Sequence, residues 1–202
     1  LAMKVKAAVV FKNADHPFTQ TRPLRIEEVD LDPPGPGEVL VKVMAAGLCH
    51  SDLSAIEGVR PRKMPYVPGH EASGIVQEVG EGVTRVKAGD HAVLFFVPNC
   101  GTCPSCDRGE PYLCDTAYEA RGDGSLITGH HKIHLNGEMI NHNSGVSCYA
   151  EYMVLAEGSV IPIEKDIPLE DAALFGCAVI TGVGAVVNTA AVPPGATVAV
   201  LG

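Results

Sequence analysis

Four cysteines are crowded into one short stretch of the chain, where they could together hold a metal ion. They lie in the run "NCGTCPSCDRGEPYLC" with the spacing C-x2-C-x2-C-x7-C, and they are Cys100, Cys103, Cys106 and Cys114. A tetrahedral zinc site of four thiolates tolerates such a loop. The bacterial iron–sulfur run C-x2-C-x2-C-x3-C-P matches only in its first two gaps, and Asp115 follows the last cysteine. We predict zinc, with an iron–sulfur cluster or unliganded thiols as the alternatives.

The predicted zinc would be structural, because four thiolates fill the tetrahedron and leave no open position for a substrate. The surrounding lobe, at about residues 97–116, is rich in glycine and proline and offers little hydrophobic core. Structural zinc contributes about 10–16 kcal/mol to the folding of small zinc peptides at neutral pH. Removal of the metal should therefore unfold this lobe before the rest of the chain.

Two of the other three cysteines could form a second metal site together with one histidine. Two thiolates from Cys49 and Cys177 and one imidazole from His70 would leave a fourth position vacant for a reactant. Spacing alone cannot join these residues, and each taken singly is read as a buried thiol or a hydrogen-bonded histidine. Cys148 has no evident partner, and we expect a buried thiol.

The composition indicates in which compartment the protein works and which classes of partner it does not bind. Seven cysteines in a chain without a signal-peptide layout favour reduced thiols, so we expect a cytoplasmic protein. The net charge of −9 and the pI near 5.3 argue against nucleic acid or an anionic membrane as a partner. We see no apolar run approaching the roughly 18–20 residues that span a bilayer.

The elements that must position these residues are mostly short strands. Runs such as "MKVKAAVVF", "EVLVKVMA" and "SGIVQEVG" are β-branched and separated by Pro/Gly turns, which predicts antiparallel β-structure with little helix before about residue 165. "IPLEDAALFG" predicts a short helix that Gly176 ends, "ITGVGAVVNTA" a second helix, and "ATVAVLG" a strand of a parallel sheet. The polar segment 120–147 predicts a solvated loop, although its four histidines leave a further metal site open: His130, His131, His134 and His142.

Several sequence blocks, in order, resemble the zinc-dependent medium-chain alcohol dehydrogenases from about Met3 to the last residue. The blocks are "PGPGEVLVKVMAAGLCHSDL", "MPYVPGHEASGIVQEVGEGVTRVKAGDHAVL", the four-cysteine run, "YAEYMVL", "GCAVITGVGAVVNTA" and "PPGATVAVLG". The resemblance implies a mainly β fold. Residues 1–178 would form a GroES-like, partly open β-barrel catalytic domain with its zinc lobe. Residues 179–202 would begin a truncated α/β Rossmann domain, with Gly202 as the first glycine of its phosphate loop.

The resemblance also implies an activity and two zinc ions. The enzyme would interconvert an alcohol and an aldehyde or ketone with NAD(H). Cys49, His70 and Cys177 match the known catalytic zinc ligands of alcohol dehydrogenase, and this zinc would serve as a Lewis acid toward the alcohol. The second, structural zinc would lie in the four-cysteine lobe.

Further roles follow from the resemblance alone. It implies three residues around the catalytic metal: Ser51 as a proton-relay hydroxyl, Asp52 as the group that orients His70, and Glu71 as an outer carboxylate. It places three residues against the cofactor and two against the substrate: His50, Thr181 and Gly202, then Phe96 and Ser144. Some of these residues also have a purely structural interpretation. Ser51 could be an ordinary loop serine, Asp52 and Glu71 could be turn or surface acids, and Phe96 could be a core residue. Ser54 departs from the family pattern, because many members have a histidine there at the outer end of the relay.

We expect this chain to be part of a longer enzyme, a homodimer or homotetramer when intact, that alone binds zinc but oxidises no alcohol. Its partner would be a small-molecule alcohol or aldehyde, and not a nucleic acid or a membrane. Three alternatives stay open: a dehydrogenase acting on a thiol adduct of formaldehyde, a zinc-free reductase of the same superfamily, and a non-enzymatic β-domain stabilised by one zinc.

Overall fold

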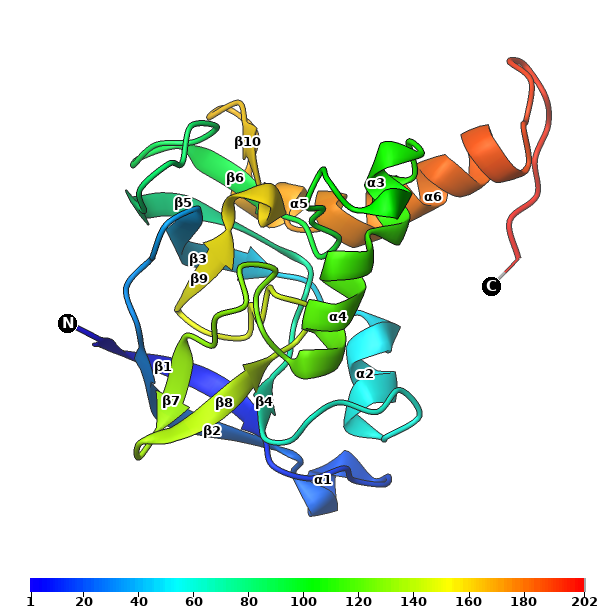
Figure 1. Cartoon of the computed structure of the whole chain (residues 1–202). Helices are drawn as coiled ribbons and strands as arrows, with labels where there is room; N and C mark the ends of the chain where they lie inside the picture. The colour runs from blue at the N-terminus through cyan, green and yellow to red at the C-terminus, as the bar shows by residue number, and fades with distance from the viewer. Residues whose placement is uncertain (202) are drawn as a thin grey trace.

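The computed structural model describes residues 1–201 and contains two β units (Figure 1). The first is a closed barrel with the strand order β1-β2-β7-β8-β4: β1 Met3–Val10, β2 Leu24–Leu31, β7 Ile133–Leu135, β8 Glu138–His142 and β4 Tyr66–Val67. The second is a five-stranded sheet with the order β10-β6-β5-β3-β9: β10 Val160–Ile163, β6 His91–Leu94, β5 Ala72–Val79, β3 Glu38–Ala46 and β9 Tyr152–Ala156. The mainly β fold that the sequence predicts is confirmed.

Strand β3 is an interior strand of the five-stranded sheet. It pairs antiparallel with β5 on one side and with β9 on the other. Its register against β5 shifts between Leu40 and Val41 and again between Val43 and Ala45. Such bulges bend a strand and increase its twist. The pairing nevertheless continues to the end of β3, where Ala46 lies opposite Ala72.

Helices before residue 165 are more numerous than the sequence predicts. The longer ones are α2 at His50–Ile56 and α4 at Asp115–Asp123, and the shorter ones are α1 at Phe18–Thr21, α3 at Pro104–Asp107, and 3-10 turns at Pro111–Leu113 and Glu157–Ser159. Helix α2 has only seven residues, too few to display a helical period. Helix α4 has a signal that the sequence reasoning overlooked, since Gly124 ends it in the left-handed conformation with φ of 81°.

The prediction of a solvated loop at 120–147 is wrong, because this segment supplies β7 and β8 of the barrel. Ile133 and Ile140 are buried in the core. His142 is also buried, which lowers its pKa to about 3. The other three histidines each meet a different carboxylate: His130 meets the buried Glu38, His131 meets Asp123, and His134 meets Asp32.

A long helical segment follows the sheet. It comprises α5 at Leu169–Ala172, a π-helical stretch at Phe175–Val179, α6 at Ile180–Gly184 and a second π-helical stretch at Ala185–Thr189. The prediction that Gly176 ends a helix is therefore wrong. A Cβ atom at Gly176 would collide with the backbone carbonyl of Leu94, so this glycine instead allows the helix to lie close against β6.

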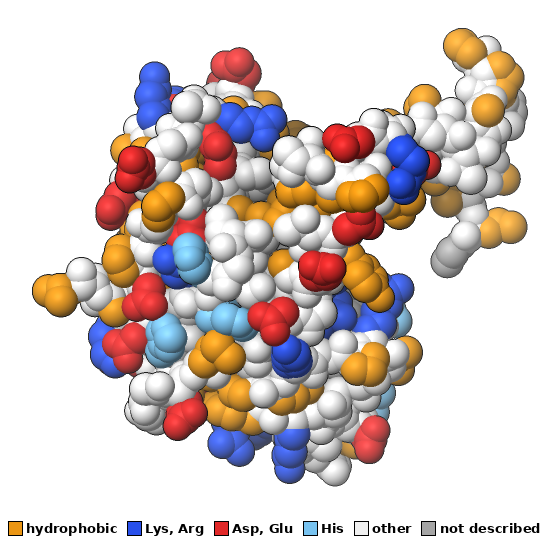
Figure 2. Space-filling model, in the orientation of Figure 1, with side chains coloured by type: hydrophobic (Ala, Val, Ile, Leu, Met, Phe, Trp, Pro, Cys, Tyr) orange, Lys and Arg blue, Asp and Glu red, His pale blue; other side chains and the backbone are white. Residues whose placement is uncertain are grey.

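By length and composition, Leu169–Thr189 could cross a membrane, which corrects the expectation that no run is apolar enough. Length and apolarity alone are weak evidence, because core helices share them. The helix and the coil after it project from the β body (Figure 1). Figure 2 shows acidic and basic side chains interspersed over the body and hydrophobic ones on the projecting segment. Three hydrophobic residues near the end of the chain, Val198, Val200 and Leu201, are exposed.

The predicted strand "ATVAVLG" is not paired with any strand within residues 1–201. A strand of a parallel sheet takes its backbone hydrogen bonds from neighbouring strands, so it cannot form without them. Gly202 lies outside the described residues.

Candidate metal centres

The four cysteines of the lobe converge on one point. Helix α3 carries Cys106, Cys103 precedes that helix, and Cys114 forms the N-cap of α4. Together with Cys100, their sulfur atoms all lie within 4.8 Å of one another. The Sγ of Cys103 is 3.5 Å from that of Cys106 and 3.9 Å from that of Cys114. Sulfurs 2.3 Å from one tetrahedral zinc would be about 3.8 Å apart, so this donor set fits zinc.

Backbone N–H groups point at these sulfurs. Cys114 Sγ accepts from the N–H of Cys100 at 3.3 Å and from that of Ala117 at 3.4 Å. Cys103 Sγ accepts from the N–H of Asp115 at 3.4 Å. Such donors stabilise thiolates, which are the form that binds metal.

The thiols of the lobe differ in acidity. A hydrogen bond from the Thr116 hydroxyl is the main influence that lowers the pKa of Cys100 to about 5. The backbone N–H of Cys106 is the main influence that lowers the pKa of Cys103. Burial raises the pKa of Cys106 itself to about 11. The surroundings of Cys100 and Cys103 therefore shift both thiols toward the thiolate before any metal binds.

A second cluster forms where β3, β5 and the long helix meet. Cys49 lies just before α2, His70 and Glu71 lie just before β5, and Cys177 comes from the helical segment Leu169–Thr189. One potential ligand atom of each of these four residues lies within 4.8 Å of the others. The structure thus brings together the three predicted ligands and places the Glu71 carboxylate among them.

The sheet explains this convergence. Ala46 at the end of β3 pairs with Ala72 at the start of β5, so the segments carrying Cys49 and His70 lie side by side. The N–H of Gly47 donates to the carbonyl of Glu71 at 2.9 Å, which extends the ladder toward the cluster. The long helix is held against the same sheet, because the hydroxyl of Ser73 donates to the carbonyl of Leu169.

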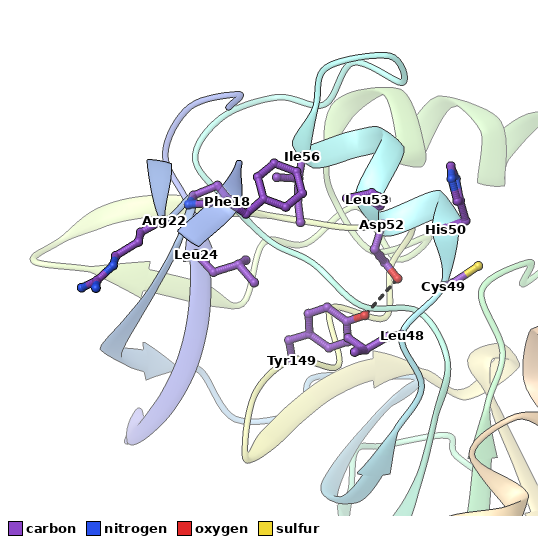
Figure 3. Close-up of a pocket in the computed structure, with 11 residues that line it drawn as sticks. Phe18, Arg22, Leu24, Leu48, Cys49, His50, Asp52, Leu53, Ile56 and Tyr149 are labelled. Carbon is purple, nitrogen blue, oxygen red and sulfur yellow. Dashed lines mark hydrogen bonds between the residues drawn. The ribbon is translucent and has the colours of Figure 1, made fainter. Parts of the chain in front are cut away.

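Asp52 holds the imidazole of His70 in a fixed orientation. Its Oδ2 is 3.1 Å from His70 Nδ1, and both side chains are buried. Its Oδ1 accepts from the N–H of Gly69 and from Asn143 Nδ2, each at 3.0 Å. The Tyr149 hydroxyl lies 3.2 Å from Oδ2, as the dashed line in Figure 3 shows. Nδ1 is occupied in this way, so Nε2 is the ring nitrogen left for a metal.

The donors of the second cluster suit zinc. Burial is the main cause that raises the pKa of Cys177 to about 12, and the neighbouring Glu71 carboxylate adds to it. A divalent cation among the four groups would offset this cost, because it favours the thiolate. Two thiolates and one imidazole with an exchangeable fourth position is the donor set of a catalytic zinc site.

A cleft of about 400 Å³ opens beside the second cluster. It contains four residues that the sequence analysis places near the chemistry: Ser51, Phe96, Ser144 and Thr181. It also contains three residues that the sequence analysis missed, namely Arg60, Arg62 and Arg121. No spacing pattern in the sequence joins these arginines, since Arg121 comes from α4 and the other two follow α2.

A larger cavity of about 740 Å³ also reaches Cys49 and Asp52 (Figure 3). Its walls are mainly apolar and include Phe18, Leu24, Leu48, Leu53 and Ile56. His50 lines this cavity, whereas Thr181 lines the cleft, so the two predicted cofactor contacts lie in different hollows. His50 Nδ1 is 3.3 Å from the Ser54 hydroxyl, and Arg60 Nη1 donates to Ser51 Oγ at 3.4 Å.

Cys148 is a buried thiol, as predicted. It is 1% exposed and its Sγ lies 3.4 Å from the carbonyl of Glu71. Burial raises its pKa well above the usual value. All seven cysteines are free thiols.

Residues 35–165 match the family model of the alcohol dehydrogenase GroES-like domain. The chain belongs to the zinc-dependent medium-chain alcohol dehydrogenase family. "Putative alcohol dehydrogenase D" of Mycobacterium tuberculosis is 43% identical over 200 residues, which cover 99% of this chain and 52% of that protein. The S-(hydroxymethyl)glutathione dehydrogenase of Escherichia coli is 43% identical over 201 residues, which cover 99% of this chain and 53% of that protein.

Among solved structures, an alcohol dehydrogenase zinc-binding domain protein from Burkholderia ambifaria superposes with a TM-score of 0.84 at 34% identity. The match covers 95% of this chain and 50% of that one. The chain therefore spans about half the length of the relatives it matches.

Proposed function

We propose that the chain is the metal-binding part of a zinc-dependent oxidoreductase that interconverts an alcohol and an aldehyde or ketone with NAD(H). The observation that carries this proposal is the convergence of Cys49, His70 and Cys177 at the wall of a cleft. A four-cysteine lobe by itself would suit a purely structural protein. A second set of metal ligands beside an open cleft suits a catalytic zinc, because a substrate in the cleft could reach the metal.

Zinc held by Cys49, His70 and Cys177 would supply Lewis acidity toward the substrate oxygen, and a second zinc on the four-cysteine lobe would stabilise the fold. Asp52 keeps His70 in the tautomer whose Nε2 is free. Glu71 is close enough to occupy the fourth position when no substrate is present. We propose one catalytic and one structural zinc per chain.

The proton of the alcohol needs an acceptor within the cleft. Ser51 lines the cleft two residues after Cys49, and we propose that its hydroxyl passes the proton outward. Its hydrogen-bond partner is Arg60, while Ser54 lies near His50 instead. The route from Ser51 to solvent therefore runs past Arg60 or through water.

The hydride acceptor is proposed to be a nicotinamide dinucleotide. Thr181, on α6 and in the wall of the cleft, would contact the nicotinamide. His50 and Gly202 would contact the phosphates, His50 from the far side of Cys49. Within residues 1–201 there is no parallel sheet that could form a Rossmann domain, so we expect these residues alone to bind zinc without turning over alcohol.

The experiment that tests this proposal combines metal analysis with an assay of the protein that carries this chain. We expect two zinc ions per chain and alcohol-dependent reduction of NAD or NADP. Cys177→Ser should abolish turnover and remove one zinc, whereas Cys148→Ser should retain both. One zinc per chain together with no dehydrogenase activity would instead support a non-enzymatic zinc-stabilised domain.

A thiol adduct of formaldehyde is the second candidate substrate. The observation that favours it is that the relative named S-(hydroxymethyl)glutathione dehydrogenase is as similar to this chain, at 43%, as the relative named an alcohol dehydrogenase. Formaldehyde oxidation that requires added thiol would distinguish it from a simple alcohol substrate. The free thiols suit the reducing cytoplasm, which we propose as the compartment, and we propose a homodimer or homotetramer.

A further inference from the structure

We propose that the substrate carries an anionic group, and that this group binds to a wall of the cleft formed by Arg60, Arg62 and Arg121. We call these three residues the arginine wall. This inference rests on the proposed function, because it names the class of alcohol that the same cleft accepts.

The arginine wall is not neutralised by the protein. No ion pair within residues 1–201 involves Arg60, Arg62 or Arg121. Of the two carboxylates of the cleft, Glu71 belongs to the metal cluster, and Asp52 pairs with His70 of that cluster. Three guanidinium groups in one cleft are unexpected in a chain with a net charge of −9. Three guanidinium groups without an ion-pair partner in one cleft would attract an anion.

The position of Arg121 is energetically unfavourable for its guanidinium group. It is half-buried, its Nε is enclosed without a hydrogen-bond partner, and its Nη2 donates only to the carbonyl of Phe96 at 3.5 Å. Burial is the main cause that lowers its pKa, and the charge of Arg62 adds to the effect. An anion between the two guanidinium groups would relieve this repulsion.

Arg62 is aimed into the cleft by a chain of hydrogen bonds that starts at the metal cluster. Its Nε donates to Asn143 Oδ1 at 3.0 Å. The amide of Asn143 donates to Asp52 Oδ1 at 3.0 Å, and Asp52 in turn holds His70. The same buried residues thus orient a metal ligand and a guanidinium group, which fixes one relative to the other.

These features specify the ligand. A planar, delocalised guanidinium pairs with the two oxygens of a carboxylate or a phosphate. With the hydroxyl at the metal cluster and the wall in the same cleft of about 400 Å³, the ligand is a small hydroxylated carboxylate or phosphate ester.

The test compares two probes that differ by one charge, benzyl alcohol and 4-(hydroxymethyl)benzoate. Their binding to the zinc-loaded full chain is measured by calorimetry at low and at high salt. We expect the benzoate to bind at least tenfold more tightly at low salt. Arg62→Gln and Arg121→Gln should each reduce this preference several-fold, and the double variant should reduce it further. The matched control is Arg85→Gln, an exposed arginine outside the cleft that should leave the preference intact.

Equal binding of the two probes by the unmodified chain would overturn the proposal. So would an equal loss in Arg85→Gln, since the preference would then reflect overall charge. Titration with NAD and with inorganic phosphate distinguishes the source of the anion. If the arginine variants weaken the binding of NAD but not that of the benzoate, the arginine wall belongs to the cofactor site, and the proposal is overturned. A protein that oxidises benzyl alcohol without favouring the benzoate contradicts only this inference, whereas a retained preference without dehydrogenase activity contradicts only the proposed function.

Discussion

Replacement of Asp52 by asparagine should weaken zinc binding at the second cluster without unfolding the chain. The carboxylate meets four donors, namely Gly69 N–H, the Asn143 amide, the Tyr149 hydroxyl and His70 Nδ1. In Asp52→Asn, one oxygen can keep the first two donors. Tyr149 loses little, because its hydroxyl also lies 3.0 Å from the carbonyl of Gly47. The loss therefore falls on His70.

The consequence for His70 is a change of tautomer. The new NH2 group faces Nδ1, which must then accept, so the ring proton moves to Nε2, the atom left for the metal. Loss of such a supporting carboxylate typically costs 10–100-fold in metal affinity, or about 1.4–2.7 kcal/mol.

Competition with a coloured zinc chelator measures this effect, because the two zinc ions should be released in separate phases. In Asp52→Asn the phase assigned to Cys49, His70 and Cys177 should shift by 10–100-fold, and the four-cysteine phase should not move. Asp123→Asn is the matched control: this exposed acid also meets a histidine, His131, at 3.2 Å, yet neither belongs to a ligand cluster. Unchanged affinities in Asp52→Asn would refute the reasoning, as would an equal shift in the control.

Three other perturbations have defined outcomes. Cys103→Ser or zinc removal should raise hydrogen exchange in the lobe first, and uniform exchange across the chain would contradict this. Glu38→Gln should cost about 3–5 kcal/mol of unfolding free energy, because it leaves buried Lys132 unpaired. Asp30→Asn, which removes a half-buried acid from a pair with the exposed Lys4, should cost under about 1 kcal/mol. Burial raises the pKa of Glu38, but hydrogen bonds from Lys132 and other groups lower that pKa overall. The stability that Glu38 contributes is therefore present above about pH 4.5 and is lost as the pH falls through the lowered pKa of the folded state. In denaturant titrations, Glu38→Gln should lose less unfolding free energy on acidification than the unmodified chain. Gly69→Ala should be several kcal/mol less stable than Gly82→Ala, since both have positive φ but only Gly69 would drive a Cβ to within 2.5 Å of the Tyr149 ring; equal melting would contradict this.

The β-strands and the four-cysteine lobe were predictable because their signals are local. The β-branched run of β1 and the spacing of Cys100 to Cys114 each lie within a short window. The sequence misled at Gly176, where a glycine expected to end a helix instead permits close contact with β6. It also misled at 120–147, whose polar residues conceal two barrel strands with buried inner faces.

The second cluster and the arginine wall depend on long-range contacts. Cys177 meets Cys49 only because the long helix lies across the sheet edge. The family resemblance supplied these ligands, and spacing alone could not have done so. Arg62 and Arg121 come together only when α4 is placed beside the loop after α2, which no periodicity in the sequence records.

Metal-edge anomalous diffraction from crystals of the zinc-loaded chain tests the central claim most directly. The account predicts two zinc peaks. One should be surrounded by the sulfurs of Cys100, Cys103, Cys106 and Cys114, and the other should lie between the sulfurs of Cys49 and Cys177 and Nε2 of His70. A single peak, confined to the four-cysteine lobe while the other three residues stay together without metal, would contradict it.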